Sequence, residues 1–156
     1  MDIDASIEQV AGILVREGFK FGTAGDKRSY RLLFGSTAVF IHFHTWQDDS
    51  VVITVSSPIL LDIDPESPGA AQALNLLEEL NRQHYFARFT FTGTTLEVDY
   101  DLLGDHLQAA ELANAIHVIA GAADHLDDHL LAALGGKKYE TKLEEWASDG
   151  DEEQPL

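Results

Sequence analysis

Seven histidines and an excess of carboxylates are the side chains of this chain that could take part in chemistry. His125 and His129 lie four residues apart in a segment that is predicted to be helical, which is a spacing that suits two zinc ligands. Asp124, Asp127 and Asp128 surround them, but the acid of the zinc-protease motif is absent from His-Leu-Asp-Asp-His. Because no full ligand set is visible, we predict a solvated acidic helix face with no metal and no cofactor.

A second pair of histidines lies in a predicted strand. The period of two in a strand places Phe40, His42, His44 and Trp46 on one face. The other face is apolar and carries Val39, Ile41 and Phe43. No third ligand accompanies the two histidines, so we interpret the four side chains as the lining of a sheet face.

No catalytic constellation is recognisable elsewhere. The chain has no cysteine, which excludes a disulfide, a thiolate nucleophile and cysteine-bound zinc, and it contains no GxSxG nucleophile motif. The segment 22–29 lacks the spacing of a phosphate-binding loop, and although it mimics the GxxG loop of KH domains, we expect a simple turn. Glu97, Asp99 and Asp101 alternate on the polar side of a predicted strand, where solvation explains them. We therefore predict that the protein is not an enzyme.

The charge of the chain limits its partners. The 27 acidic and 10 basic residues give a net charge of -17, and neither 32–81 nor 89–136 contains a lysine or arginine. Such a field repels phosphate backbones and anionic membranes, so we expect neither nucleic acid nor membrane as a partner. The acidic N-terminus does not resemble a signal peptide, and no apolar run approaches the ~20 residues that span a bilayer, so a cytoplasmic location is expected.

Periodicity predicts the elements that position these residues in the N-terminal half. A helix is expected over 5–17, capped by Asp4. Three strands follow, at 30–34, 38–45 and 51–56. Ser67-Pro68 has the pattern of a helix start, and the second helix is expected to run to about Gln83. Its predicted buried side consists of Leu74, Leu77 and Leu80.

A hairpin and a long helix are predicted next. A type II′ turn at Gly93-Thr94 places Arg88 opposite Asp99, with the apolar pairs together on one face. The long helix is expected to start after Asp105, to bury a seam of apolar residues and to end at Gly135-Gly136. The seam consists of Leu112, Ile116, Ile119, Ala123, Leu126, Leu130 and Ala133.

The chain end is expected to differ from this domain. We predict a single domain over 1–136 and an acidic tail over 137–156. Tyr139, Leu143 and Trp146 could form the apolar stripe of a short helix, and the segment 149–156 is predicted to be disordered.

Several short matches give the chain a family resemblance. They are Phe34-Gly35-Ser36-Thr37-Ala38-Val39-Phe40, Ser57-Pro58-Ile59-Leu60, Leu80-Asn81-Arg82, Phe86-Ala87-Arg88-Phe89 and Leu134-Gly135-Gly136. With the order of elements they span about 4–136, and there the chain resembles the bacterial YbjN family, whose fold is similar to that of the small chaperones of type III secretion. The resemblance implies an α+β fold of order α-β-β-β-α-β-β-α with an antiparallel sheet packed against helices.

The resemblance also implies a function. It predicts a non-enzymatic homodimer that holds a peptide or protein segment of an unknown client, or that acts as a regulatory adaptor through such contact. We predict that Phe40, His42, His44 and Trp46 form the peptide-binding surface. The alternative is a small-molecule-responsive regulatory domain of sensory transduction, which a closed pocket within the monomer would favour.

Overall fold

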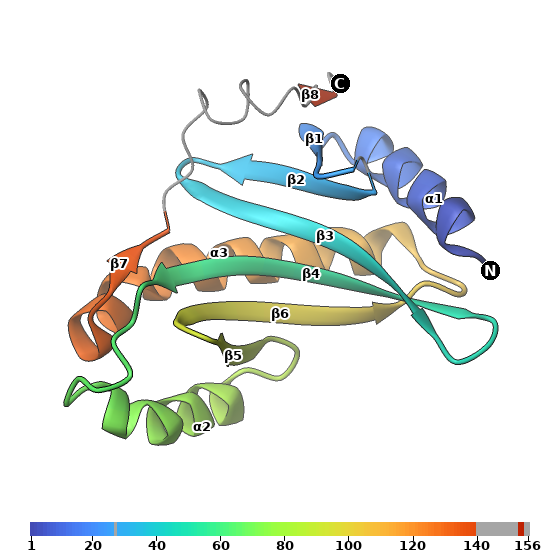
Figure 1. The fold of residues 1–156 in the computed structure, drawn as a ribbon. Helices are drawn as coiled ribbons and strands as arrows, with labels where there is room; N and C mark the ends of the chain where they lie inside the picture. Colours follow the sequence, from blue (N-terminus) through green and yellow to red (C-terminus); the bar gives the residue numbers. More distant parts are fainter. Residues whose placement is uncertain (27, 140–152, 155–156) are drawn as a thin grey trace.

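The computed structural model describes residues 1–26, 28–139 and 153–154, and it shows helices packed on an antiparallel sheet (Figure 1). The helical elements are α1 (Ile3–Arg16), the 3₁₀ turn η1 (Ala70–Gln72), α2 (Ala73–Gln83) and α3 (Ala109–Leu134). The strands are β1 (Phe21–Ala24), β2 (Ser29–Phe34), β3 (Thr37–Trp46), β4 (Ser50–Leu61), β5 (Arg88–Thr92), β6 (Thr95–Leu103), β7 (Lys137–Lys138) and β8 (Glu153–Gln154). The strand order is β5-β6-β4-β3-β2-β1-β8, with β7 paired to β4. The predicted α+β class is confirmed.

The expected order of elements is present, with three short strands added to it. β1 was missed because 22–29 was predicted to be a turn, whereas its first residues pair with β2. Phe21 explains the difference, since its side chain is only 3% exposed and packs edge-on against Tyr30 at 5.3 Å. Burial of this ring holds the segment against the sheet, although its own sequence has weak strand propensity.

The core lies between the sheet and the helices α1 and α3. Most of the alternate residues of β3 and β4 that face the helices are fully buried, among them Ile41 and Ile53. They form one cluster with Leu14 of α1 and with Leu112 and Ile116 of α3. Each such side chain contributes roughly 1.5–3 kcal/mol on burial, so this cluster fixes which sheet face the helices cover.

The hairpin β5–β6 has the predicted register. Arg88 pairs with Asp99 and Phe89 with Val98, and Gly93 has a φ of 64°, as a type II′ turn requires at its first central position. The paired apolar residues Phe89, Leu96 and Val98 are buried together. A slip of one residue would expose them, which explains why the register could be predicted.

Two helix starts were predicted wrongly. α1 is capped by Asp2, not Asp4, because the Asp2 carboxylate accepts the N–H of Ala5 at 2.7 Å. α3 starts at Ala109 with Gln108 at the cap, and the Glu111 carboxylate accepts the Gln108 N–H at 3.1 Å. Asp105 instead lies 3.6 Å from the N-terminal ammonium. This tertiary ion pair removes Asp105 from the capping role.

The second helix also begins later than expected. Ser67 accepts the N–H of Ala70 at 3.3 Å and so starts η1, and α2 follows only at Ala73. Leu74 was expected inside but is 78% exposed. The buried side of α2 consists of Ala73, Leu77 and Leu80. Leu77 and Leu80 are buried as predicted, and Ala73 takes the place of Leu74 because positions i, i+4 and i+7 lie on one helix face.

The seam of α3 is largely as predicted up to Leu130. At the last turn Leu134 is buried in place of Ala133, which is exposed. Beyond the helix, the Tyr139 N–H donates to the Ile59 carbonyl at 3.0 Å, so this residue extends along β4. The other two residues of the predicted tail stripe, Leu143 and Trp146, lie outside the described residues. The domain boundary at residue 136 stays a prediction.

Candidate functional site

The side of the sheet opposite α1 and α3, called the outer face below, carries the four residues predicted to bind a peptide. Phe40, His42, His44 and Trp46 follow one another on alternate positions of β3, while their neighbours Ile41 and Phe43 face the core. Phe40 and His42 are half-buried, His44 is exposed and Trp46 is 48% exposed. The structure therefore brings these four side chains to one surface, and their role as a binding site stays a prediction.

Apolar residues from the neighbouring strands extend this surface at one end. In the register of the sheet, His44 pairs with Val52 of β4, and Val52 pairs with Leu103 of β6. Leu103 is 48% exposed, as is Trp46. Trp46, Val52 and Leu103, grouped around His44, are called the apolar end. Large exposed apolar side chains that gather in this way are typical of contact surfaces.

Aromatic stacking orders the other end of the β3 strip. The Phe40 and His42 rings are stacked with centroids 6.2 Å apart and 13° between their planes, and Tyr139 packs edge-on against Phe40 at 6.5 Å. Burial lowers the pKa of His42, as does the nearby His44, against a smaller opposing effect of Glu97. His42 is thus neutral at pH 7 and acts as a flat aromatic surface.

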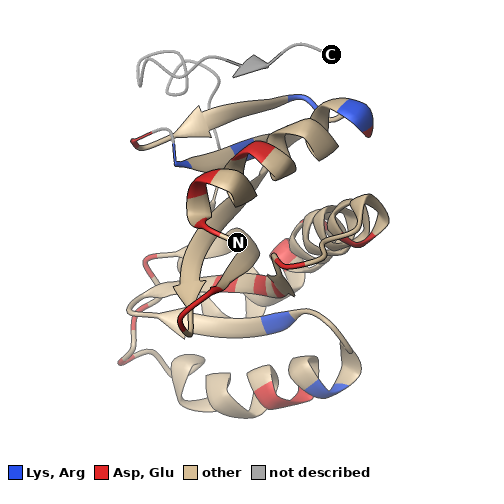
Figure 2. Ribbon diagram, turned by 90° about the vertical axis from the view of Figure 1, so that its right-hand side faces the viewer, with Lys and Arg blue, Asp and Glu red and all other residues tan. Residues whose placement is uncertain are grey.

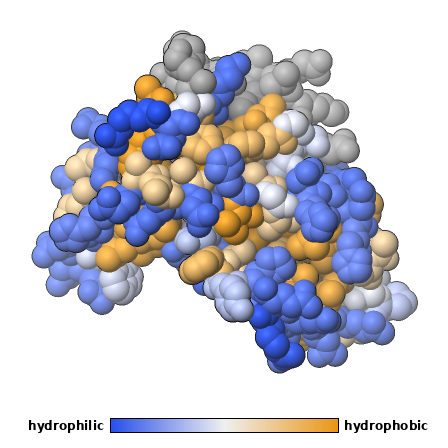
Figure 3. Space-filling model, turned by 180° about the vertical axis from the view of Figure 1, so that it is seen from behind, coloured by the Kyte–Doolittle hydropathy of each residue, from blue (hydrophilic) through white to orange (hydrophobic). Residues whose placement is uncertain are grey.

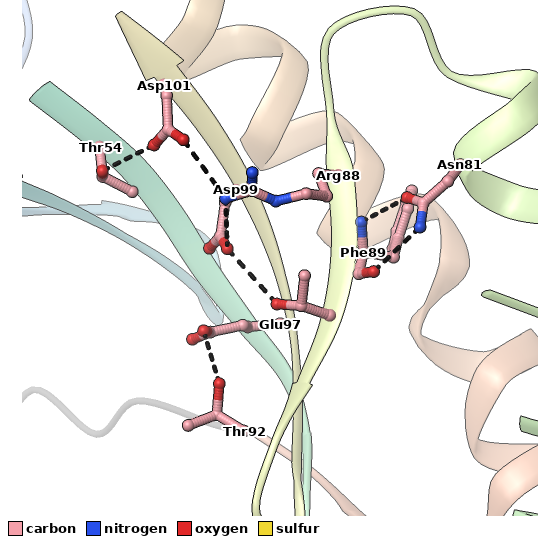
Figure 4. Close-up of polar contacts among 9 residues, drawn as sticks. Thr54, Asn81, Arg88, Phe89, Thr92, Glu97, Asp99 and Asp101 are labelled. Carbon is pink, nitrogen blue, oxygen red and sulfur yellow. Dashed lines mark hydrogen bonds and ion pairs between the residues drawn. The ribbon is translucent and has the colours of Figure 1, made fainter. Parts of the chain in front are cut away.

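A row of carboxylates lies beside the apolar end. Glu97, Asp99 and Asp101 of β6, called the acidic row, face the same side as Leu103 because they occupy alternate positions of one strand (Figure 4). The Arg88 guanidinium lies 3.3 Å from the Asp101 carboxylate and 3.8 Å from that of Asp99. Hydroxyl groups donate to all three carboxylates, from Thr92 to Glu97, Thr90 to Asp99 and Thr54 to Asp101.

Asp99 is unusual among these acids because it is only 8% exposed. Burial, followed by the charge of Glu97, raises its pKa from 3.8 to about 6, while Arg88 opposes the shift. The solvated role expected for this residue from strand alternation is therefore wrong. A carboxyl group with a pKa near 6 changes its charge close to physiological pH.

The described residues also engage both outer edges of the sheet. At β5, the Asn81 side chain accepts the Phe89 N–H at 2.6 Å and donates to the Phe89 carbonyl at 3.1 Å, as a neighbouring strand would (Figure 4). At β1, Gly22 pairs with Glu153 and Phe21 with Gln154. Edges engaged in this way are less open to pairing with another chain, so the outer face is the larger candidate surface.

The other candidate sites are weaker. His125 and His129 are exposed, and the described part of the chain contains no group of three or more residues able to hold a metal ion. A groove of about 710 Å³ lies between α1 and β1–β2 and is lined in part by Gly12, Val15 and Tyr30. The helix side, seen in Figure 3, shows apolar patches separated by hydrophilic side chains.

Sequence reasoning missed the parts of this site that come from other strands. Leu103 and the acidic row join the β3 strip only because β6 pairs with β4 across a long connection. The alternation of 97–101 marked a polar face, and the hairpin predicted the strand on one side of it, but neither pattern said that β4 lies on the other side. Among the described residues, no helix combines the length and hydrophobicity that crossing a membrane requires.

Comparison with known proteins agrees with the fold. Residues 4–142 match the family model TY-Chap1, described as the T3SS (YopN, CesT) and YbjN peptide-binding chaperone 1. The crystal structure of YbjN from E. coli, a protein described as a candidate transcription regulator, superimposes with a TM-score of 0.56 at 12% identity. The alignment covers 86% of this chain and 96% of that chain, and at this identity it shows the fold alone. No curated protein sequence matches significantly.

Proposed function

Because the chain belongs to the TY-Chap1 family of peptide-binding chaperones, we propose that it binds an extended or helical segment of a client protein through the outer face. The observation that supports this site is the apolar end, where Trp46 and Leu103 are each 48% exposed on a sheet face that α1 and α3 leave free. The family is described as a chaperone and not as an enzyme, so binding without chemistry is the expected activity.

The energetics of such binding follow from the surface. A tryptophan that becomes buried in a contact is among the strongest contributors to affinity, and residues of this kind commonly cost ~2 kcal/mol or more on truncation. Val52 and His44 flank Trp46 and Leu103 in the sheet register, so a bound side chain at this end would contact several neighbours at once. The neutral His42 and Phe40 continue the strip along β3.

The finer features of the proposal are a homodimer, a regulatory adaptor role and a cytoplasmic location. A second copy could bury large apolar side chains that are exposed away from the outer face, such as Val15 and Phe86. Regulation would act through protein contact, because acidic residues predominate over the molecule (Figure 2) and the net charge of -17 disfavours direct binding to nucleic acid.

Capture of clients from native lysate tests the proposal when wild type is compared with a Trp46→Ser/Leu103→Ser variant. We expect one or two proteins that co-purify with wild type in near-stoichiometric amount and fall by about tenfold with the variant. Leu74→Ser/Tyr85→Ser is the matched control, since both residues are exposed but lie on or beside α2. Equal retention by the double variant would remove the outer face from the proposal, and light scattering of wild type tests the homodimer.

A small-molecule-responsive function is the second candidate. The groove beside α1 could serve it, although this groove is open to solvent and is not the closed pocket that would favour such a function. Its volume of about 710 Å³ lies within the roughly 300–1,000 Å³ range of ligand sites. A Cβ atom added at Gly12 has no heavy atom within 4 Å, so Gly12→Leu should fill the groove and leave the helix intact. A metabolite that raises the melting temperature of wild type but not of Gly12→Leu would favour this function.

A further inference from the structure

We propose that the outer face selects client segments in which a lysine or arginine lies two residues from an aromatic or aliphatic residue. This inference rests on the proposed function and adds the chemistry of the partner. It follows from the position of the acidic row next to the apolar end on the same side of β6. Neither feature would define the client by itself.

The spacing of the two features comes from strand geometry. Leu103 and Asp101 are two residues apart on β6 and face the same side, so their side chains are about 7 Å apart along the strand. An extended client segment has the same repeat, because its alternate side chains also face one side. A segment that places an apolar side chain on Leu103 and Val52 therefore brings the side chain two residues away to Asp101.

The acidic row already holds one guanidinium in this structure. Arg88 reaches it from β5 and lies 3.3 Å from the Asp101 carboxylate, with its own side chain 58% exposed. Three carboxylates thus face this one base, and Glu97, whose described hydrogen bond comes from the Thr92 hydroxyl, lies at the far end of the row. The row consequently favours an additional positive charge.

The charge of the acidic row disfavours two other occupants of the outer face, a second copy of the chain and the C-terminal segment of the chain itself. A second copy that used this face symmetrically would bring its acidic row close to the first, since a two-fold contact pairs the same patch on both subunits. The C-terminal segment of the chain itself carries Asp149, Asp151, Glu152 and Glu153, which the row would repel. A basic segment of another protein is the occupant that complements the charge.

Selection from a displayed library of random 12-residue peptides tests this inference. Peptides selected by wild type should be enriched in lysine or arginine two residues from an aromatic or aliphatic residue. In fluorescence anisotropy titrations, a selected peptide should bind Glu97→Gln/Asp101→Asn about tenfold more weakly than wild type. Glu8→Gln/Glu17→Gln removes the same charge from exposed sites in and next to α1 and should change the affinity by less than about twofold.

Arg88→Gln is expected to increase the affinity for a basic peptide, and an increase in affinity cannot result from misfolding. Removal of the resident guanidinium frees the acidic row, so the affinity for a basic peptide should rise severalfold. Weaker binding by this variant would overturn the inference. Selected peptides without basic enrichment that still lose affinity with Trp46→Ser/Leu103→Ser would also overturn it and leave the proposed function intact. A selection that yields no binding peptide would overturn both.

Discussion

Replacement of Asp99 by asparagine should stabilise this protein at alkaline pH. The carboxyl group is 8% exposed, and burial followed by the charge of Glu97 raises its pKa from 3.8 to about 6. Between these two values the native state binds a proton more tightly than the unfolded state, so the free energy of unfolding falls as pH rises through this window. Above about pH 7 the native protein carries the full cost of a buried charge.

The magnitude follows from the two pKa values. A difference of one pKa unit corresponds to about 1.4 kcal/mol. The rise of the Asp99 pKa from 3.8 to about 6 therefore sets an upper limit of about 3 kcal/mol on the cost of the buried charge. Asparagine removes this cost but loses the attraction to Arg88, which is 3.8 Å away and largely exposed and therefore contributes less than about 1 kcal/mol. We expect a net gain of about 1–2 kcal/mol at pH 8 and no gain near pH 3.5.

Urea unfolding followed by circular dichroism at pH 3.5, 5, 6 and 8 measures the effect. Asp101→Asn is the matched control, because Asp101 lies on the same face of β6 but is exposed, and it should give no gain at any pH. A variant Asp99→Asn that is no more stable than wild type at pH 8, or that gains equally at pH 3.5 and pH 8, would refute the argument from burial.

Three further substitutions test the fold that carries the site. Asn81→Ala removes two hydrogen bonds to the Phe89 backbone and should lower the free energy of unfolding by about 1–3 kcal/mol and increase light scattering on heating, because it exposes the β5 edge. Gly121 lies on an exposed part of α3, and a Cβ added there has no heavy atom within 4 Å. Chemical denaturation of Gly121→Ala should therefore show a free energy of unfolding about 1 kcal/mol higher than that of wild type. Gly69→Ala would press its Cβ into the Ala133 carbonyl and should instead lower the melting temperature, and an unchanged value would contradict the close approach of the two backbones.

Local sequence patterns predicted some properties of the acidic row and not others. Alternation along 95–103 predicted which residues share a face, and the Gly93-Thr94 turn predicted that Arg88 lies opposite Asp99. Both are local properties, because the two strands are joined by a two-residue turn. The burial of Asp99 was not predictable in this way, since it depends on β4, which reaches β6 only across the long connection through α2 and β5.

The predictions of the helix starts and of the buried face of α2 were also partly wrong. Asp105 has the right chemistry for a cap, but the N-terminal ammonium, distant in sequence, lies 3.6 Å away and engages it. Leu74 has the right hydrophobicity for the core, but Ala73 occupies the buried position beside Leu77 and Leu80, and Leu74 is exposed. A contact with a distant part of the chain thus decided the role of Asp105, and hydrophobicity alone did not decide between Ala73 and Leu74 for the buried position.

The sequence by itself determined the fold class, the face on which Phe40, His42, His44 and Trp46 lie, and the register of the late hairpin. These depend on periods of 2 and 3.6 residues and on one turn, which are fixed by neighbours along the chain. Only the tertiary structure decided that Leu103 of β6 extends that face into an apolar end and that a partly buried acidic row lies beside it. The pairing of β4 with β6 depends on which surfaces can be buried together, and that is a property of the whole chain.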